Sequence, residues 1–146
     1  MPTNVLVIDD DIAITELMAA LLQANGFDVV TTNCGMEGVK FAAEKSPSIV
    51  LLDLMMPKMD GWQVCKAIRK FSNIPILVLS SVSDPNMVAS VLDAGADGFL
   101  TRPVPAGVLV AHIKKMTRQT GSLGNVILTP KVESAAVQRN TQPIAS

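Results

Sequence analysis

Acidic residues stand at the ends of two apolar segments of the sequence. Asp9, Asp10 and Asp11 directly follow NVLVI, and Asp53 ends SIVLLD. A buried carboxylate without a partner costs free energy, and carboxylates packed together raise one another's pKa unless a cation lies between them. Mg²⁺ prefers oxygen ligands of this kind, together with water and phosphate oxygens. The pattern therefore predicts a magnesium site built from Asp9, Asp10 and Asp53.

Further polar residues follow apolar segments later in the chain. Ser80 and Ser81 close PILVLSS, and Arg102 follows DGFLT. Arg102 would bring a second positive group to the acidic residues. A carboxylate between Mg²⁺ and a fixed cation can accept a phosphoryl group, because both cations neutralise oxygens during the transfer. We therefore predict that Asp53 is a phosphoryl acceptor.

The chain that must position these residues alternates between short apolar runs and amphipathic segments. The expected strands cover residues 4–8, 27–32, 48–53, 75–80 and 97–101. The expected helices cover about 11–25, 35–45, 61–71, 84–95 and 105–118. This alternation predicts an α/β fold with a doubly wound, five-stranded parallel sheet. With strand order 2-1-3-4-5, the first and third strands lie side by side, and Asp9, Asp10 and Asp53 share one crevice.

Local signals predict how each helix begins, ends and packs. The expected N-caps are Asp11, Asp60 and Asp84, and the expected helix stops are Gly26 and Gly95. The expected inward faces are Ile14, Leu17, Met18, Leu21 and Leu22 in the first helix, Val39, Ala42 and Ala43 in the second, Val64, Cys65 and Ile68 in the third, and Val108, Leu109, Ile113 and Met116 in the last. Cys34 and Cys65 are isolated in the sequence, so we expect reduced, packed side chains.

Composition narrows the class of protein. The chain has 146 residues, enough for one domain with a real core, and its net charge of −1 gives no electrostatic footprint for nucleic acid. No apolar run approaches a membrane span and the acidic residues come too early for a secretory signal, so we expect a cytoplasmic protein. Residues 1–118 are expected to form the domain and 119–146 a polar tail, in which 125–129 could add a strand.

Four motifs resemble the receiver domain of bacterial two-component response regulators, including the stand-alone chemotaxis type. They are VLVIDDD, LLDLMMPKMDG, PILVLSS and GADGFLTRPV, and the resemblance covers about residues 3–118. It implies a flavodoxin-like receiver fold in which Asp53 accepts phosphate from a histidine kinase or phosphotransfer protein. It also implies Mg²⁺ held by Asp9, Asp10, Asp53 and the backbone carbonyl of Met55.

The same resemblance implies a signalling switch rather than an enzyme acting on other substrates. Ser80 occupies the position of the switch hydroxyl and Phe99 that of the switch aromatic residue. Family members often have a cis bond before the proline that corresponds to Pro103. The implied partners are a kinase and a downstream protein target, and the family pattern allows a homodimer through the fourth helix, fifth strand and fifth helix.

One position departs from the family pattern, which has lysine where this chain has Arg102. Arginine is a planar fork and lysine a compact point charge, so the exchange is not conservative. We expect the fork to hold the Asp53 carboxylate by two charge-assisted hydrogen bonds and so to slow phosphorylation. Ser81 replaces a residue that is usually small, such as alanine, and is a milder change.

Two other functions compete with the phosphorylation switch. A receiver-like module that binds partners without phosphate is supported by Arg102 and opposed by the intact acidic residues. An aspartyl-nucleophile hydrolase or phosphotransferase would need a second carboxylate two residues after Asp53, where Met55 stands. A DNA-binding output would need a domain that the tail cannot form, so the output is expected to be another protein, or the chain a fragment. His112 and Trp62 are expected to be structural or surface residues.

Overall fold

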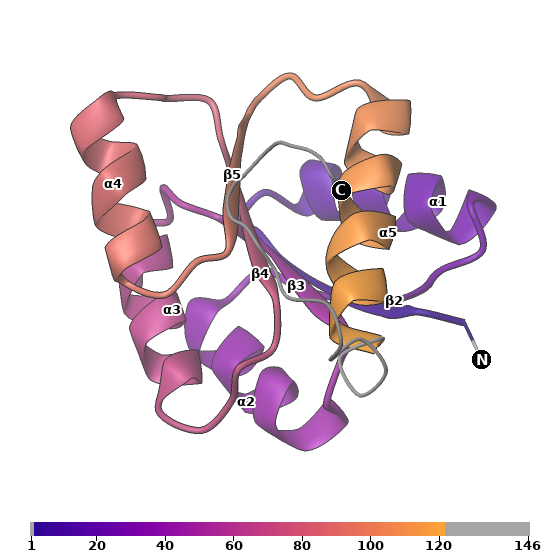
Figure 1. The fold of residues 1–146 in the computed structure, drawn as a ribbon, viewed down its shortest axis with the longest axis horizontal. Helices are drawn as coiled ribbons and strands as arrows, with labels where there is room; N and C mark the ends of the chain where they lie inside the picture. Colours follow the sequence, from indigo (N-terminus) through magenta and orange to yellow (C-terminus); the bar gives the residue numbers. More distant parts are fainter. Residues whose placement is uncertain (1, 122–146) are drawn as a thin grey trace, which may run out of the picture.

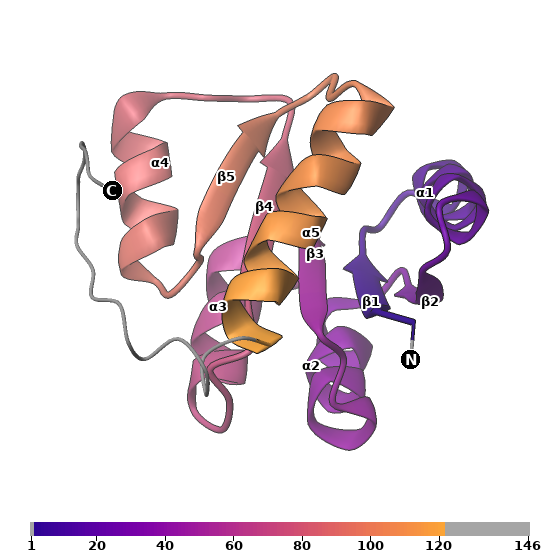
Figure 2. The same cartoon turned by 45° about the vertical axis from the view of Figure 1, so that its right-hand side comes forward.

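The computed structural model describes residues 2–121, which form one parallel sheet with helices on both faces (Figures 1 and 2). The strands are β1 (Asn4–Ile8), β2 (Asp28–Thr32), β3 (Ile49–Asp53), β4 (Ile76–Ser80) and β5 (Gly98–Thr101). The helices are α1 (Ile12–Ala24), α2 (Gly35–Lys45), α3 (Gly61–Arg69), α4 (Pro85–Asp93) and α5 (Ala106–Gly121). The strand order is β2-β1-β3-β4-β5, which confirms the predicted fold.

Successive side chains along each strand point to opposite faces of the sheet, so the core has two layers. One cluster joins Leu6, Val50 and their neighbours to α2, α3 and α4, and the other joins Val7, Leu51 and their neighbours to α1 and α5. Both clusters are almost entirely aliphatic and withdrawn from solvent. Because β3 and β4 are covered on both faces, they are buried along their whole length, as expected for central parallel strands.

The predicted helix boundaries follow from side-chain capping. Asp11 accepts hydrogen bonds from the backbone of the first turn of α1, and Asp60 forms a reciprocal capping box with Gln63 in α3. Asp84 caps α4, which begins with a proline. Gly26 and Gly95 have φ angles of 88° and 118°, so both turns use the left-handed conformation that glycine tolerates. These starts and stops confirm the predictions.

Three residues predicted to face the core are exposed instead. Leu17 in α1 is 63% exposed, Val108 in α5 is 44% exposed, and Ala43 in α2 faces solvent. Side chains advance by about 100° per residue around a helix, and the sheet-facing positions are set by buried neighbours such as Thr15 and Leu22 in α1. Leu17 therefore points away from the sheet. Ala43 in α2 and Val108 in α5 likewise lie beside the buried positions Ala42 and Leu109, but one residue away around the helix.

The buried side of α2 consists of small residues, and of the predicted Val39, Ala42 and Ala43 only Ala42 is fully buried. Gly35, Gly38 and Ala42 are its buried positions, and a Cβ atom at Gly38 would overlap the Ile8 side chain. Cys65 is buried as predicted, but Cys34 is exposed at the start of α2, so the prediction that it packs is wrong.

The last helix ends at Gly121, three residues later than the predicted boundary at 118. The segment 125–129, predicted as a candidate extra strand, lies outside the described residues. Within the described part of the chain, no helix combines the length and apolar character needed to cross a lipid bilayer.

Candidate functional site

The carboxyl ends of β1 and β3 bring three aspartates together. Ile8 pairs with Leu52 in the parallel register, so the residues that follow, Asp9 and Asp53, leave the sheet side by side. Asp9, Asp10 and Asp53 each offer a carboxylate oxygen, and these oxygens all lie within 4.8 Å of one another. Asp9 and Asp53 are buried, whereas Asp10 is exposed. This is the cluster that the sequence predicted.

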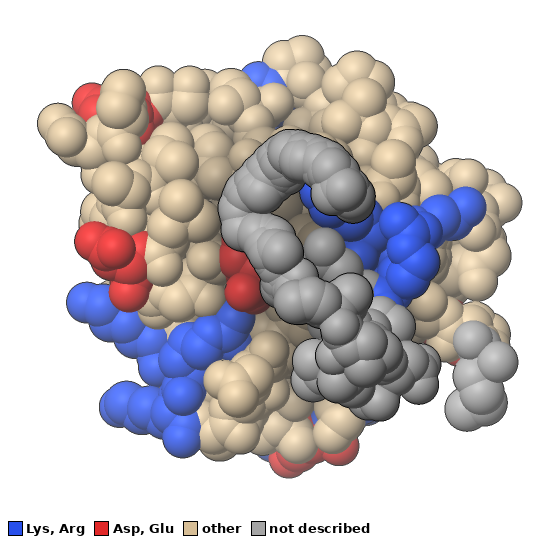
Figure 3. Space-filling model, in the orientation of Figure 1, with Lys and Arg blue, Asp and Glu red and all other residues tan. Residues whose placement is uncertain are grey.

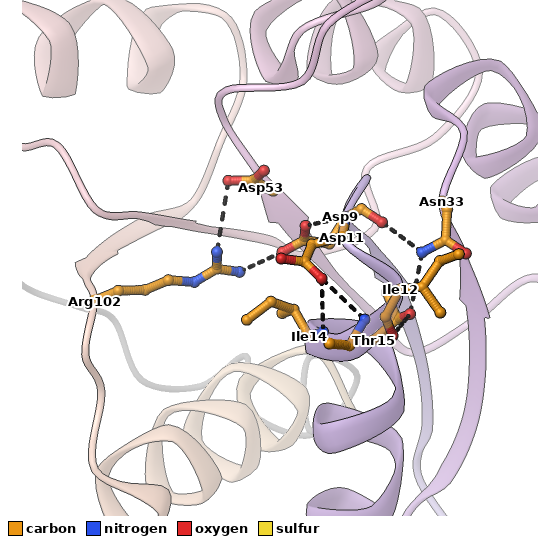
Figure 4. A network of polar contacts seen from close by, with 9 residues as sticks. Asp9, Asp11, Ile12, Ile14, Thr15, Asn33, Asp53 and Arg102 are labelled. Carbon is orange, nitrogen blue, oxygen red and sulfur yellow. Dashed lines mark hydrogen bonds and ion pairs between the residues drawn. The ribbon is translucent and has the colours of Figure 1, made fainter.

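The start of α1 and the end of β2 hold Asp9 in place (Figure 4). The Asp9 Oδ1 atom accepts a hydrogen bond from the Asp11 backbone N–H at 3.0 Å. Asn33, which follows β2, donates its Nδ2 to the Asp9 carbonyl at 2.8 Å and to the Thr15 hydroxyl at 3.1 Å. Sequence reasoning missed Asn33 and Thr15. The rule that selected the aspartates, a polar residue directly after a strand, also applies to Asn33.

Arg102 reaches the acidic cluster from the end of β5. Its Nη2 donates to Asp9 Oδ2 at 2.7 Å, while Nη1 lies 3.8 Å from Asp53 Oδ1 (Figure 4). The second distance is an ion pair without a hydrogen bond. The prediction that the fork grips Asp53 by two hydrogen bonds is therefore wrong. The fork bridges two carboxylates, because Asp9 and Asp53 lie within reach at the same time.

The surroundings of Asp53 disfavour its negative charge. Burial is the largest cause and the charge of Asp9 the next, and together they raise the pKa of Asp53 from 3.8 to about 6. The Arg102 guanidinium and a backbone hydrogen bond at Met55 oppose this rise in pKa. The negative charge of Asp53 therefore lies in a place where additional positive charge would be stabilising.

The donor set suits a hard divalent cation. Mg²⁺ binds through oxygen ligands and keeps several water molecules, so it needs few carboxylates and an open side. The cluster offers carboxylate oxygens from Asp9, Asp10 and Asp53, with the exposed Asp10 on its solvent side. These residues therefore fit the ion that the sequence predicted.

The predicted switch residues lie on the neighbouring strands. Ser80 ends β4 fully buried, and its hydroxyl accepts a hydrogen bond from the Val82 backbone N–H at 3.2 Å. Phe99 in β5 is half-buried and packs against the core cluster on the α4 side of the sheet. The peptide bond between Arg102 and Pro103 is cis, as the resemblance implied.

The remaining singled-out residues lie away from the acidic cluster. His112 is half-buried on α5, on the helix layer shared with α1. Trp62 in α3 donates its indole N–H to the Ser90 hydroxyl in α4 at 2.9 Å. Both results agree with structural roles for these two residues.

Comparison with known proteins agrees with the fold and identifies the family. The family model described as the response regulator receiver domain matches residues 5–114. The chain is 39% identical over 132 residues to a CpxR homologue, a transcriptional regulatory protein of Haemophilus influenzae, an alignment that covers 90% of this chain and 58% of the relative. It is 37% identical over 121 residues to the response regulator MprA of a Mycobacterium species, with 82% and 53% covered. The chain thus spans a little over half the length of these relatives.

Solved structures give the same result. The chemotaxis protein CheY4 of Vibrio cholerae matches with a TM-score of 0.74 and 29% identity, covering 80% of this chain and 99% of that protein. The BeF3-activated receiver domain of RstA from Klebsiella pneumoniae matches with a TM-score of 0.76 and 30% identity, covering 80% and 100%. The protein therefore belongs to the response regulator receiver domain family.

Proposed function

We propose that this chain is a phosphorylation-controlled signalling switch that accepts a phosphoryl group on Asp53 from a histidine kinase or a phosphotransfer protein. The observation that carries the proposal is the position of the Asp53 carboxylate, which lies within 4.8 Å of carboxylate oxygens of Asp9 and Asp10 and 3.8 Å from the guanidinium of Arg102. Asp53 thus has both oxygen ligands for a cation and a positively charged side chain beside it. This is the environment that phosphoryl transfer to a carboxylate needs.

Each residue has a defined part in the proposed reaction. An Asp53 oxygen attacks phosphorus, forming an O–P bond while the P–N bond to the donor histidine breaks and its electron pair returns to the imidazole nitrogen. Mg²⁺, held by Asp9, Asp10, Asp53 and the Met55 carbonyl, would neutralise phosphoryl oxygens during the transfer. Arg102, whose guanidinium lies beside Asp53, would also neutralise phosphoryl oxygens.

The proposed response to phosphate begins at Ser80. Ser80 is buried at the end of β4 and directly follows Leu79, which pairs with Asp53 on the adjacent strand. A phosphoryl group on Asp53 would offer the Ser80 hydroxyl a stronger acceptor and draw it inward. Phe99 would then repack, which would change the surface formed by α4, β5 and α5.

We propose that the output passes through a contact with another protein, a homodimer through α4, β5 and α5 included. In the view of Figure 3, basic side chains gather in two groups, one beside α3 and one beside α5, and acidic side chains lie next to the group at α3. With a net charge of −1, this surface gives no support to direct binding of nucleic acid. The relatives that are named transcriptional regulators are longer than this chain.

The proposal is tested by intact-mass measurement after treatment with acetyl phosphate or phosphoramidate, with and without Mg²⁺. We expect one added phosphoryl group in the wild type with Mg²⁺ and none in Asp53→Asn. Changed hydrogen exchange across residues 80–104 in the phosphorylated sample is expected from the switch. An unmodified wild type under every donor, or an equally modified Asp53→Asn protein, would contradict the proposed acceptor.

The alternative function is a receiver-like module that binds its partner without phosphorylation. It is favoured by one observation, the ion pair of Arg102 with Asp9, because this contact already neutralises a carboxylate of the proposed metal site. A partner that bound wild type and Asp53→Asn equally well, with and without phosphodonor, would establish this alternative.

A further inference from the structure

The guanidinium of Arg102 lies between two of the three carboxylates that we propose as metal ligands (Figure 4). The Asp9 side chain is only 2% exposed, whereas that of Arg102 is 25% exposed. Water therefore stabilises the Asp9 carboxylate poorly, and a buried carboxylate needs a positive partner. Arg102 supplies that partner in the resting protein.

Both oxygens of Asp9 are already engaged. Oδ1 accepts the Asp11 backbone N–H at 3.0 Å and Oδ2 accepts Arg102 Nη2 at 2.7 Å. A metal ion on Asp9 must share an oxygen with one of these donors or replace it. A divalent cation on Oδ2 would stand next to the guanidinium in a poorly hydrated site, where like charges repel strongly. Replacement of the guanidinium avoids this repulsion.

Among the described residues, the Arg102 side chain can leave Asp9 without breaking a second hydrogen bond. Its backbone is fixed by the N–H that donates to the Ser80 carbonyl at 2.8 Å. Its guanidinium, in contrast, makes one hydrogen bond, to Asp9, and one longer ion pair, to Asp53, within the described part of the chain. A lysine ammonium is a single point charge and would not contact the two carboxylates through separate nitrogens.

We infer that Arg102 and Mg²⁺ compete for the Asp9 carboxylate, so that this arginine sets the Mg²⁺ concentration at which the site becomes ready for phosphoryl transfer. The inference rests on the proposed function for the use of the metal, but its physical content is a binding equilibrium. Released from Asp9, the guanidinium would still lie beside Asp53, where phosphoryl oxygens would arrive. The exchange of lysine for arginine would then act on metal binding rather than on the nucleophile itself.

The direct test is calorimetric titration of the full chain with Mg²⁺ at neutral pH and low ionic strength. Arg102→Met should bind Mg²⁺ at least about tenfold more tightly than the wild type, since the competing charge is gone. Arg102→Lys should lie between the two. Arg118→Met, which removes an exposed charge from α5, is the matched control and should stay within about twofold of the wild type. Equal affinity of wild type and Arg102→Met, or no binding by either, would overturn the inference.

A second measurement uses the wild type alone and so does not depend on how the variants fold. Guanidinium nitrogen signals in NMR report the contacts of individual arginines. Saturation with Mg²⁺ should shift the Arg102 signal and leave that of Arg69, which pairs with Asp97 elsewhere in the molecule, unchanged. An Arg102 signal that does not respond to Mg²⁺ would overturn the competition.

The competition and the proposed function fail separately. If Mg²⁺ displaces Arg102 but no donor phosphorylates Asp53, the competition stands and the phosphorylation switch falls. If Asp53 is phosphorylated but the affinity for Mg²⁺ is the same in wild type and Arg102→Met, only the competition falls.

Discussion

Two arginines hold aspartates near the two ends of β5, and their contacts differ in kind. Arg69, at the end of α3, donates to the carbonyls of Ser72, Ile74 and Gly95 and to the Asp97 carboxylate, at 2.8 to 3.1 Å. Its stem lies so close to Gly95 that a Cβ atom there would be 2.6 Å from Arg69 Cγ. Arg69 therefore ties α3 to the turn before β4 and to the turn before β5.

In the part of the chain that the structure describes, the side chain of Arg102 has no such set of backbone partners. Its guanidinium makes one hydrogen bond to Asp9 and one loose contact with Asp53 among the described residues. An arginine whose donors are taken up by backbone carbonyls has a fixed place in the fold, because its departure would leave partly buried acceptors without a donor. An arginine between carboxylates that require a cation can be replaced by another cation. The comparison thus separates a structural arginine from an exchangeable one.

The largest expected effect is the loss of Arg69. Arg69→Met should lower the free energy of unfolding by roughly 2–4 kcal/mol, because three carbonyls lose their side-chain donor and, among the described residues, the Asp97 carboxylate keeps only the Ile76 backbone N–H. Arg102→Met should lower it by about 1–3 kcal/mol in metal-free buffer, because Asp9 loses its counter-ion. Saturating Mg²⁺ should abolish most of the second loss and none of the first. Urea unfolding of both variants with EDTA and with Mg²⁺ measures the difference.

The result that would break the comparison is equal rescue of the two variants by Mg²⁺. In that case the metal would stabilise the protein as a whole, and Arg102 would have no special relation to the acidic cluster. Arg118→Met again serves as the control for losing a positive charge, and we expect a change of less than about 0.5 kcal/mol.

The next effect concerns the carboxylate that Arg102 only partly neutralises. The folded state raises the pKa of Asp53 to about 6, above its ordinary value of 3.8, so the folded protein binds this proton more tightly than the unfolded chain. Stability should therefore fall as the pH rises from about 4 to about 6, and the cost should remain above that range. Asp53→Asn removes the charge, so without metal at pH 7 it should be more stable than wild type by roughly 1–3 kcal/mol.

Urea unfolding between pH 3.5 and pH 7.5 in EDTA checks both the sign and the pH range. The advantage of Asp53→Asn should disappear below about pH 4, where the wild-type carboxyl group is protonated in both states. A variant that is less stable than wild type at pH 7 would show that Arg102 fully neutralises Asp53. The distinction between a structural and an exchangeable arginine would then not hold for Arg102.

The acidic cluster was predictable from the sequence because parallel strands carry their carboxyl ends to one edge of the sheet. That rule needs only the strand positions and the strand order, and it selected Asp9, Asp10 and Asp53. The direction of the Arg102 fork was not predictable, since Asp9 and Asp53 both lie within reach and the choice depends on side-chain torsions. The sequence pattern contains no information on those torsions.

The role of Arg69 was missed for a different reason. Most of its partners are backbone carbonyls, which every residue carries, so no pattern of residue types marks them. The inward positions of Leu17 and Val108 were wrong because a 3.6-residue period places a stripe only to within one position. Helix rotation against the sheet decides such borderline residues, and packing of the whole layer sets that rotation.

The smallest expected effect concerns a second contact made by α3, the helix that carries Arg69. Trp62 in α3 donates to the Ser90 hydroxyl in α4 at 2.9 Å, near the surface, so water can replace either partner. Trp62→Phe and Ser90→Ala should therefore show a coupling of only about 0.5 kcal/mol in a double-mutant cycle. A coupling above about 1.5 kcal/mol would mean that this bond, and not the backbone contacts of Arg69, fixes the α3–α4 side of the sheet. If the coupling is small, Ser90→Ala removes the hydrogen bond to the Trp62 indole and leaves the fold intact. Trp62 fluorescence would then report on the position of α4.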